Sequence, residues 1–211
     1  MIKIENVSKR FGNNILFENT SIEISGNKTL IKGENGEGKS VLMKMIVGYS
    51  IPDEGRILYD QHKQIGKETD FIEDAGVSIN APEFVKNWTG MENLIYLSKI
   101  NKTCPISRLE SLVKILNLDE DINKKYKTYS LGMKQKMRLI QALMDEPKYL
   151  ILDEPFNALD VKSKTLVKEY LNTYLNDDPS RMLVYTSHTI EDDEFATQII
   201  IIDNHNLVCV D

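Results

Sequence analysis

Apolar and polar positions follow two different periods along the chain, and these periods predict where it forms strands and helices. Segments such as MIKIEN and TSIEIS alternate with a period of two, which is typical of strands with one buried face. Segments such as KSVLMKMIVG carry apolar residues at helical spacing. Strands are predicted over residues 1–6, 20–25, 27–33, 76–80, 149–153 and 182–188, a turn and strand over 51–60, and a terminal hairpin over 199–211. Helices are predicted over residues 39–48, 90–100, 107–118, 131–144 and 161–177.

The order of these elements predicts an α/β fold with a mostly parallel sheet, because strands alternate with helices along most of the chain. The strand YLILD is apolar throughout, as expected for a strand that is buried on both faces. Residues 90–127 differ, since they contain two amphipathic helices joined by a polar linker around Cys104 and Pro105. This stretch predicts a helical subdomain. A chain of 211 residues is long enough for one α/β domain with a full core and a small attached subdomain.

Composition excludes several classes of protein. The formal net charge is −6 and the pI is near 5.2, so the summed field would repel phosphate backbones and nucleic acid is not an expected partner. The two cysteines, Cys104 and Cys209, have no metal-like spacing and are expected to be packing residues in a reducing compartment. No stretch approaches the roughly 18 apolar residues of a membrane span, and the N-terminus lacks a signal peptide. We therefore expect a soluble, cytoplasmic chain that another polypeptide would hold at any membrane.

The stretch GENGEGKS, from Gly33 to Ser40, follows a predicted strand and opens a predicted helix. In that context the backbone N–H groups of a glycine-rich loop bind the β-phosphate of a nucleotide at the positive end of the helix. Lys39 would bridge the β- and γ-phosphates, and the Ser40 hydroxyl would bind Mg²⁺. The alternative is a glycine-rich loop that only turns the chain. The candidate nucleotide-binding residues here are Gly33, Asn35, Gly36, Gly38, Lys39, Ser40 and Val41.

A pair of acids, Asp153 and Glu154, follows the buried strand YLILD. In a parallel sheet the carboxyl ends of the strands meet at one edge, so this pair is expected beside the phosphate-binding loop. Asp153 would reach Mg²⁺ through water, and Glu154 would polarise the attacking water. Two acids after a strand are by themselves more often part of a solvated loop. The phosphate-binding loop earlier in the chain favours the catalytic interpretation.

The helix predicted from Leu131 starts in an unusual way. Ser130 is a suitable N-cap, but Gly132 lies inside the first turn, where glycine costs up to about 1 kcal/mol relative to alanine. Lys134 and Lys136 crowd the positive end of the helix dipole, where acidic side chains are preferred. This helix start therefore predicts an anion as its ligand.

Together these motifs resemble those of the ATP-binding subunit of an ABC transporter, and the resemblance covers the whole chain. TYSLGMKQK, residues 128–136, is similar to the signature motif of that family, which is usually written LSGGQ. The form YSLGMKQ is similar to that of exporters of the bacitracin and lantibiotic resistance type. The resemblance implies a P-loop NTPase fold over a single domain, residues 1–211. It would combine an N-terminal antiparallel β subdomain with a helical subdomain, about residues 84–135, inserted in a RecA-like core. ATP and Mg²⁺ are the implied cofactors.

The resemblance places further residues at the nucleotide. Ser130 and the backbone at Gly132 would meet the γ-phosphate of ATP held by a second copy, which implies a head-to-tail homodimer in the ATP-bound state. Asp160, in FNALD, matches the residue that crosses this dimer interface. Phe11 matches the aromatic residue that stacks on adenine, although a phenylalanine beside a strand is equally often part of a core. His188 matches the switch histidine at the γ-phosphate, although a histidine after a strand is by default a capped surface residue. The implied catalytic residues are Glu154, His188 and Lys39.

Several positions depart from the family pattern. Leu131 and Met133 replace the first glycine and the glutamine of the signature, so Ser130 and the backbone would have to carry the phosphate contact. Asn80, in GVSINAPEF, stands where the family places a glutamine on Mg²⁺ and the attacking water. Asparagine has the same amide but reaches about 1.5 Å less far, which predicts a weakened or water-mediated metal contact and slower turnover. The candidate metal-binding residues are Ser40, Asn80 and Asp153.

Phe84, Val85 and Trp88 lie just before the helical stretch, where the family contacts its membrane subunit. They either pack under these helices or form an apolar socket for a helix of an integral membrane permease. The resemblance favours an ATPase that energises a membrane exporter at the cytoplasmic face of the plasma membrane, with antimicrobial peptides or drugs as cargo by analogy. A soluble ABC ATPase with an assembly or regulatory role is the alternative. A small-molecule kinase would leave the signature motif unexplained, and His62 and His205 fit no motif.

Overall fold

The computed structural model describes residues 1–60, 62–80, 83–101 and 104–210, and its strands form two sheets. The first sheet is antiparallel, has the order β2-β1-β4-β5, and contains β1 (Ile2–Phe11), β2 (Asn14–Ile24), β4 (Glu54–Tyr59) and β5 (Lys63–Gln64). The second sheet has the order β10-β9-β3-β8-β7-β6 and contains β3 (Lys28–Lys32), β6 (Ala75–Ser78), β7 (Tyr149–Leu152), β8 (Met182–Thr186), β9 (Gln198–Asp203) and β10 (Asn206–Val210). Its strand pairs are parallel except for the pair of β9 and β10.

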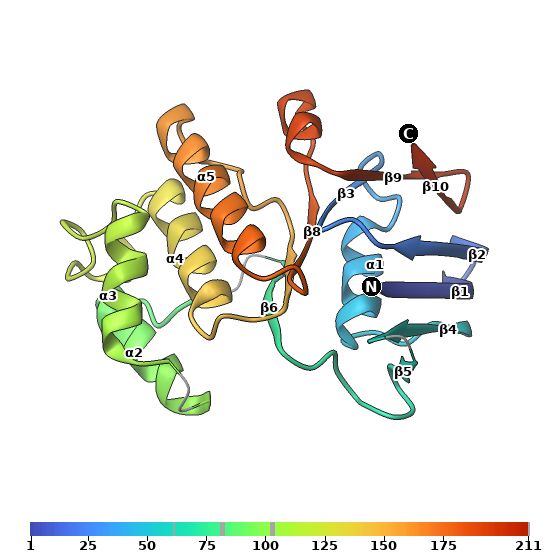
Figure 1. The fold of residues 1–211 in the computed structure, drawn as a ribbon, viewed down its shortest axis with the longest axis horizontal. Helices are drawn as coiled ribbons and strands as arrows, with labels where there is room; N and C mark the ends of the chain where they lie inside the picture. The colour runs from blue at the N-terminus through green and yellow to red at the C-terminus, as the bar shows by residue number, and fades with distance from the viewer. Residues whose placement is uncertain (61, 81–82, 102–103, 211) are drawn as a thin grey trace.

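The helices lie on both faces of the second sheet. They are α1 (Lys39–Val47), α2 (Gly90–Asn101), α3 (Ile106–Ile115), α4 (Leu131–Leu143) and α5 (Val161–Asp177), with 3-10 segments η1 (Tyr126–Thr128) and η2 (Ile190–Phe195). Helix α1 lies between the two sheets, and α2 and α3 lie at the opposite end of the long axis from β1, β2 and β4 (Figure 1). In the described part of the chain, no helix is both long and apolar enough to cross a membrane.

The second sheet separates two hydrophobic cores. Leu150 and Leu152 of β7 contribute to the core that contains α4 and α5, whereas Tyr149 and Ile151 contribute to the core around α1. This division follows from the alternation of side chains along a strand. Both faces of β7 are therefore covered, and all its residues are buried, which explains its uninterrupted apolar sequence.

The predicted fold class is confirmed, with an N-terminal antiparallel sheet, a mostly parallel second sheet and added helices. Helices α2, α3 and α4 share one continuous core with α5 and one face of the second sheet. The division into a single domain with a helical subdomain over about residues 84–135 stays a prediction. Residues 102 and 103 of its expected linker lie outside the described residues.

One prediction about the cysteines is wrong. Cys104 is buried, as expected for a packing residue, but Cys209 is exposed. Cys209 lies in β10, which is an edge strand of the second sheet, and its side chain faces solvent beside the Gln198 amide. Leu207, two residues earlier on the same face of β10, is buried, so alternation alone does not expose Cys209. Cys209 lies one residue from the end of this edge strand, where the cover on that face ends.

Candidate functional site

The glycine-rich loop at residues 33–40, the acid pair and His188 come together because their strands are neighbours. In the second sheet β8 lies between β3 and β7, and the three strands are parallel. Gly33 follows β3, Asp153 follows β7, and His188 comes two residues after the end of β8. The carboxyl ends of these strands therefore form one edge, which is where open α/β sheets bind ligands.

The loop before α1 has the backbone of a phosphate-binding loop. Gly36 and Gly38 have positive φ angles of 90° and 104°, which glycine adopts because it has no Cβ to clash. The Lys39 side chain is buried, and its ammonium donates hydrogen bonds to the carbonyl oxygens of Gly33 (2.7 Å) and Glu34 (2.8 Å). The fold thus holds a lysine charge across the loop, where the phosphates of a nucleotide would lie.

The same loop already binds a carboxylate of the chain itself. The Glu37 side chain accepts a hydrogen bond from the Glu34 N–H. Consecutive backbone N–H groups that turn inward form an anion-binding concavity. The loop residues therefore fit an anionic ligand.

The two acids after β7 are fixed by contacts to neighbouring elements. The Ser40 hydroxyl donates to Asp153 Oδ2 at 2.9 Å, and the Thr186 hydroxyl donates to Asp153 Oδ1 at 2.7 Å. The same Thr186 oxygen accepts a hydrogen bond from the Glu154 N–H at 2.9 Å. Glu154 has a φ of 48°, in the left-handed region that residues other than glycine rarely adopt. These contacts stabilise an uncommon backbone geometry at the residue expected to act on water.

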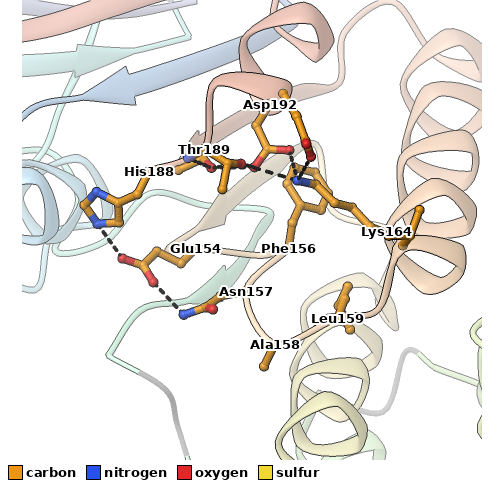
Figure 2. Close-up of a pocket in the computed structure, with 12 residues that line it drawn as sticks. Glu154, Phe156, Asn157, Ala158, Leu159, Lys164, His188, Thr189 and Asp192 are labelled. Carbon is orange, nitrogen blue, oxygen red and sulfur yellow. Dashed lines mark hydrogen bonds and ion pairs between the residues drawn. The ribbon is translucent and has the colours of Figure 1, made fainter.

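The Glu154 carboxylate is held from both sides. His188 Nε2 lies 2.8 Å from Oε1, and the Asn157 amide donates to Oε2 at 2.9 Å (Figure 2). On the backbone side, the Gln135 amide of α4 donates to the carbonyl oxygens of Glu154 (3.2 Å) and Pro155 (3.0 Å). The carboxylate therefore has a defined orientation, which a general base needs.

Most of the predicted site residues line one cavity of about 250 Å³. Its lining residues are Leu16, Asn35, Gly36, Gly38, Lys39, Ser40, Val41, Asp153, Glu154 and His188. A second cavity of about 250 Å³ shares the two acids with it and is lined by Ser78, Asn80, Gln135, Arg138, Asp153, Glu154 and Asn157. Asn80 therefore lies in the cavity beside the acids, in a left-handed conformation that asparagine tolerates.

Other predicted residues lie away from the first cavity. Ser130 caps α4 and accepts a hydrogen bond from the Met133 N–H at 3.2 Å. Leu131 next to it is 73% exposed. A Cβ on Gly132 would lie 2.9 Å from the carbonyl oxygen of Ala158, so glycine lets α4 approach the FNALD segment. This close contact adds a packing reason for a glycine in the first turn.

Asp160 and Phe11 also lie outside the first cavity. Asp160 caps α5, and the hydrogen bond from the Ser163 N–H (2.8 Å) lowers the pKa of its carboxyl. Phe11 is 55% exposed at the end of β1, and the Lys9 ammonium lies 5.3 Å from the centre of its ring. Phe11 is therefore not a core residue in this structure, and its ring is available to a planar ligand.

Thr186, Asn157 and Gln135 contact the acid pair but were not expected from the sequence. Asn157 lies three residues after Glu154, so its position gave a weak signal. Thr186 and Gln135 gave none, because their contacts are made across strands and helices that only the fold brings together.

The oxygen atoms at the start of α1 fit Mg²⁺. The Ser40 hydroxyl and the Asp153 carboxylate are hard donors of the kind that Mg²⁺ prefers. Among the described residues, no three His, Cys, Asp or Glu side chains gather as a metal site. A magnesium ion that also binds nucleotide phosphates needs only one or two protein ligands. When bound, such an ion neutralises charge on the β- and γ-phosphates.

Comparison with known proteins identifies the family. The family described as ABC transporter matches residues 17–157 of the chain. The chain belongs to the ABC transporter family. The predicted family, fold and ATPase class of enzyme are thereby confirmed, with ATP as the nucleotide. The dimeric structure of MJ0796, a bacterial ABC transporter cassette, superposes with a TM-score of 0.81 at 25% identity, covering 98% of this chain and 96% of that one. An ATP-binding subunit of an ABC transporter gives a TM-score of 0.84 at 20% identity, with 100% and 90% coverage, which shows the likeness of fold alone.

Relatives known by sequence carry out different kinds of transport. The chain is 29% identical over 202 residues to the bacitracin transport ATP-binding protein BcrA of Enterococcus faecalis, covering 95% of this chain and 65% of BcrA. It is 31% identical over 211 residues to the sulfate/thiosulfate import ATP-binding protein CysA of Thermosynechococcus vestitus, covering 96% of this chain and 61% of CysA. The chain spans less than two thirds of the length of these relatives. Family membership therefore fixes neither the cargo nor the direction of transport.

Proposed function

We propose that this chain is the ATP-hydrolysing subunit of a membrane exporter and that it works as an ATP-dependent homodimer. The observation that carries the proposal is the separation of the expected ATP contacts within one chain. Lys39, Ser40 and Glu154 line a single cavity, whereas Ser130 and Gly132 lie outside it, at the start of α4. A second copy, placed head to tail, would bring the signature segment of one chain to the phosphate-binding loop of the other. The dimeric cassette of the same fold supports this arrangement.

Within each site, the residues have distinct proposed roles. Lys39 holds the β- and γ-phosphates, and Ser40 and Asp153 bind Mg²⁺. Glu154 accepts a proton from the attacking water, and His188 orients its carboxylate through the 2.8 Å contact. For the remaining contacts we propose that Phe11 stacks on adenine, that Asn80 reaches the metal through water and that Asp160 crosses the dimer interface.

The homodimer is tested with Glu154→Gln and Ser130→Arg. Glu154→Gln keeps the shape of the side chain but removes the base, so ATP should bind and hydrolysis should fall by about 10²- to 10⁴-fold. Size-exclusion chromatography with light scattering, at millimolar Mg·ATP, should show a stable dimer. Ser130→Arg, added to Glu154→Gln, should restore the monomer because it places a bulky charge where the second nucleotide would dock. A Glu154→Gln protein that stays monomeric under these conditions contradicts the proposed homodimer.

For the partner, we propose a short cytoplasmic helix of an integral membrane permease in a groove at α2. The groove has a volume of about 270 Å³ and is lined by Glu83, Phe84, Val85, Asn93, Tyr96, Leu97 and Gln141. Phe84 packs against Tyr126, with 5.1 Å between ring centres, and is half-buried. Val85 and Trp88 are exposed, and Trp88 pairs with exposed Tyr96. Thus Phe84 packs under the helices, while Val85, Trp88 and Tyr96 form an exposed apolar surface that suits a partner helix.

The partner is tested by purifying a tagged chain from detergent-solubilised membranes and identifying what is recovered with it. We expect a polytopic membrane protein to be recovered in a fixed ratio to the tagged chain. The chain would then lie at the cytoplasmic face of the membrane. Tyr96→Ala should lower its recovery. Tyr49→Ala is the matched control, because Tyr49 also belongs to an exposed aromatic pair, with Phe71, away from the groove. A soluble partner, or none from a chain that binds ATP, would favour a non-transport ABC ATPase.

The export direction and a peptide or drug cargo rest on the YSLGMKQ form and on the similarity to BcrA.

A further inference from the structure

A buried carboxylate outside the first cavity binds groups from two separate segments. Asp192 of η2 is 1% exposed. Its Oδ1 lies 2.8 Å from the ammonium nitrogens of both Lys164 and Lys168, which belong to α5. Its Oδ2 accepts hydrogen bonds from the hydroxyls of Thr189, at 2.6 Å, and of Ser187. One side chain therefore joins α5 to the turn after β8.

That turn carries the switch histidine. Ser187 and Thr189 flank His188, so Asp192 fixes the residue on each side of it. The Tyr185 hydroxyl, within β8, also donates to the Asp192 carbonyl oxygen at 2.8 Å. His188 itself points away from Asp192 and toward Glu154 (Figure 2). The position of the imidazole is thus set by a turn that Asp192 holds at both ends.

The two lysines extend the connection to the FNALD segment. The Lys164 N–H donates to the Asp160 carbonyl oxygen at 2.9 Å, in the first turn of α5. The Lys168 ammonium lies 5.2 Å from the centre of the Phe156 ring. Phe156 and Asp160 are the two ends of FNALD, and this segment also contains Asn157, whose amide binds the Glu154 carboxylate. Asp192 is therefore linked directly to the segment that contains His188, and through the two lysines to the segment that contains Asn157.

The charges in this cluster are matched. Burial alone would raise the pKa of Asp192, but the close ammonium groups of Lys164 and Lys168 and the hydroxyls on Oδ2 outweigh it and hold the pKa well below the ordinary value of 3.8. Exposed Glu191 is a further charged group in this cluster, 3.5 Å from Lys164. A buried carboxylate stays ionised only when it is paired and hydrogen-bonded. Replacing a lysine or a hydroxyl of this cluster would therefore leave part of the Asp192 charge uncompensated.

We propose that Asp192 is a positioning residue for ATP hydrolysis, which joins α5 to the turn at residues 187–189 and thereby sets the His188 imidazole against Glu154. The inference rests on the proposed roles of His188 and Glu154 in hydrolysis. Asp192 itself is not among the residues that line the first cavity.

The first test is Asp192→Asn, which keeps the shape of the side chain and removes its charge. Because misplacement of a catalytic group by about 1 Å costs on the order of 100-fold, kcat should fall about 10- to 100-fold while the KM for ATP changes less than about two-fold. Asp193→Asn is the matched control. Asp193 is the next residue of η2 and pairs with Lys32 at 2.6 Å, so the control also breaks an ion pair of this segment. Its kcat should stay within about two-fold of the original value.

The deciding test is a double-mutant cycle with His188→Ala, with folding checked by thermal denaturation. If Asp192 acts through His188, Asp192→Asn should lower kcat less than about two-fold further in the His188→Ala background. A loss that is undiminished in that background overturns the inference and leaves the role of His188 intact. A His188→Ala protein with unchanged kcat overturns both.

Should Asp192→Asn fail to fold, Thr189→Val serves in its place. It removes the hydroxyl bonded to Asp192 but leaves both lysine ion pairs, and the same loss and the same dependence on His188 are expected. An unchanged kcat, or a loss independent of His188, overturns the inference.

Discussion

The Thr186 hydroxyl attaches both acids of the nucleotide site to the neighbouring strand. It lies at the end of β8, fully buried, and binds the Glu154 N–H and the Asp153 carboxylate. Thr186→Val keeps the shape of the side chain but removes both hydrogen bonds. We expect this variant to lose stability and activity together.

The size of the stability loss can be worked from these two contacts. A neutral hydrogen bond contributes about 0.5–1.5 kcal/mol and one to a charged group about 1.5–3 kcal/mol, so their sum is roughly 2–4.5 kcal/mol. Asp153 is half-buried and keeps its bond from Ser40, which favours the lower end, about 2 kcal/mol. For a domain of this size each kcal/mol lowers Tm by about 2–4 °C, so Tm should fall by about 4–8 °C.

The activity loss follows from the backbone of Glu154. Its left-handed conformation costs about 1–3 kcal/mol and persists only while its surroundings enforce it. Without the bond to Thr186, the backbone can relax and carry the carboxylate away from His188. We expect kcat to fall about 10- to 100-fold, with little change in the KM for ATP because Lys39 is untouched.

The control for this prediction is Thr186→Ser, which keeps the hydroxyl and loses one methyl group. It should lose about 1 kcal/mol of stability by thermal denaturation and keep most of the ATPase activity, measured as phosphate release. If the serine variant is as inactive as the valine variant, packing of the methyl group explains the effect and the reasoning is wrong. A valine variant with normal kcat would refute it equally.

Three further predictions concern other parts of the chain. Asn80→Gln should raise kcat because the longer side chain brings the amide closer to the metal. An unchanged or lower kcat would show that the length of the Asn80 side chain does not limit turnover. Gly132→Ala places a Cβ 2.9 Å from the Ala158 carbonyl oxygen, so it should lower the free energy of unfolding in urea by about 1 kcal/mol despite the better helix propensity of alanine; a more stable variant would contradict this. The pKa of Asp192 is lower in the folded than in the unfolded state, so its stabilisation is present above pH 4 and is lost as the pH falls further. Urea denaturation between pH 5 and pH 3 should therefore show a larger loss for the original protein than for Asp192→Asn, and equal losses would count against the lysine pairing.

The fold was predictable where one period held over a whole element. The uninterrupted run YLILD identified β7, and helical spacing identified α1 and α5. Strand β2 begins at Asn14, well before the predicted start at residue 20, because its alternation is broken: Leu16 and Phe17 are both buried, and Asn19 takes a left-handed conformation. Such irregularities move successive side chains to the same face, so a search for period two misses the strand. The 3-10 segment η2 was not predicted, since a short acidic stretch has no period.

The site was predictable where its residues are contiguous in sequence. GENGEGKS and the acid pair could be interpreted from the neighbouring sequence, because each follows a recognisable strand. Thr186 and Asp192 could not be found in this way. Each is an ordinary polar residue whose partners come from other elements, and its importance depends on which strands and helices the sheet order makes neighbours.

Helix α4 connects the signature segment to the acid of the same chain. Gln135 lies little more than one turn after Ser130, is buried, and donates to the carbonyl oxygens of Glu154 and Pro155. At its first turn α4 also approaches the FNALD segment, through Gly132. In the proposed dimer Ser130 would meet the nucleotide of the partner, so a shift of α4 on closure would act on Glu154 of its own chain. In that dimer the backbone geometry of Glu154 would respond to two nucleotides: its own through the loop before α1, and that of the partner through Gln135.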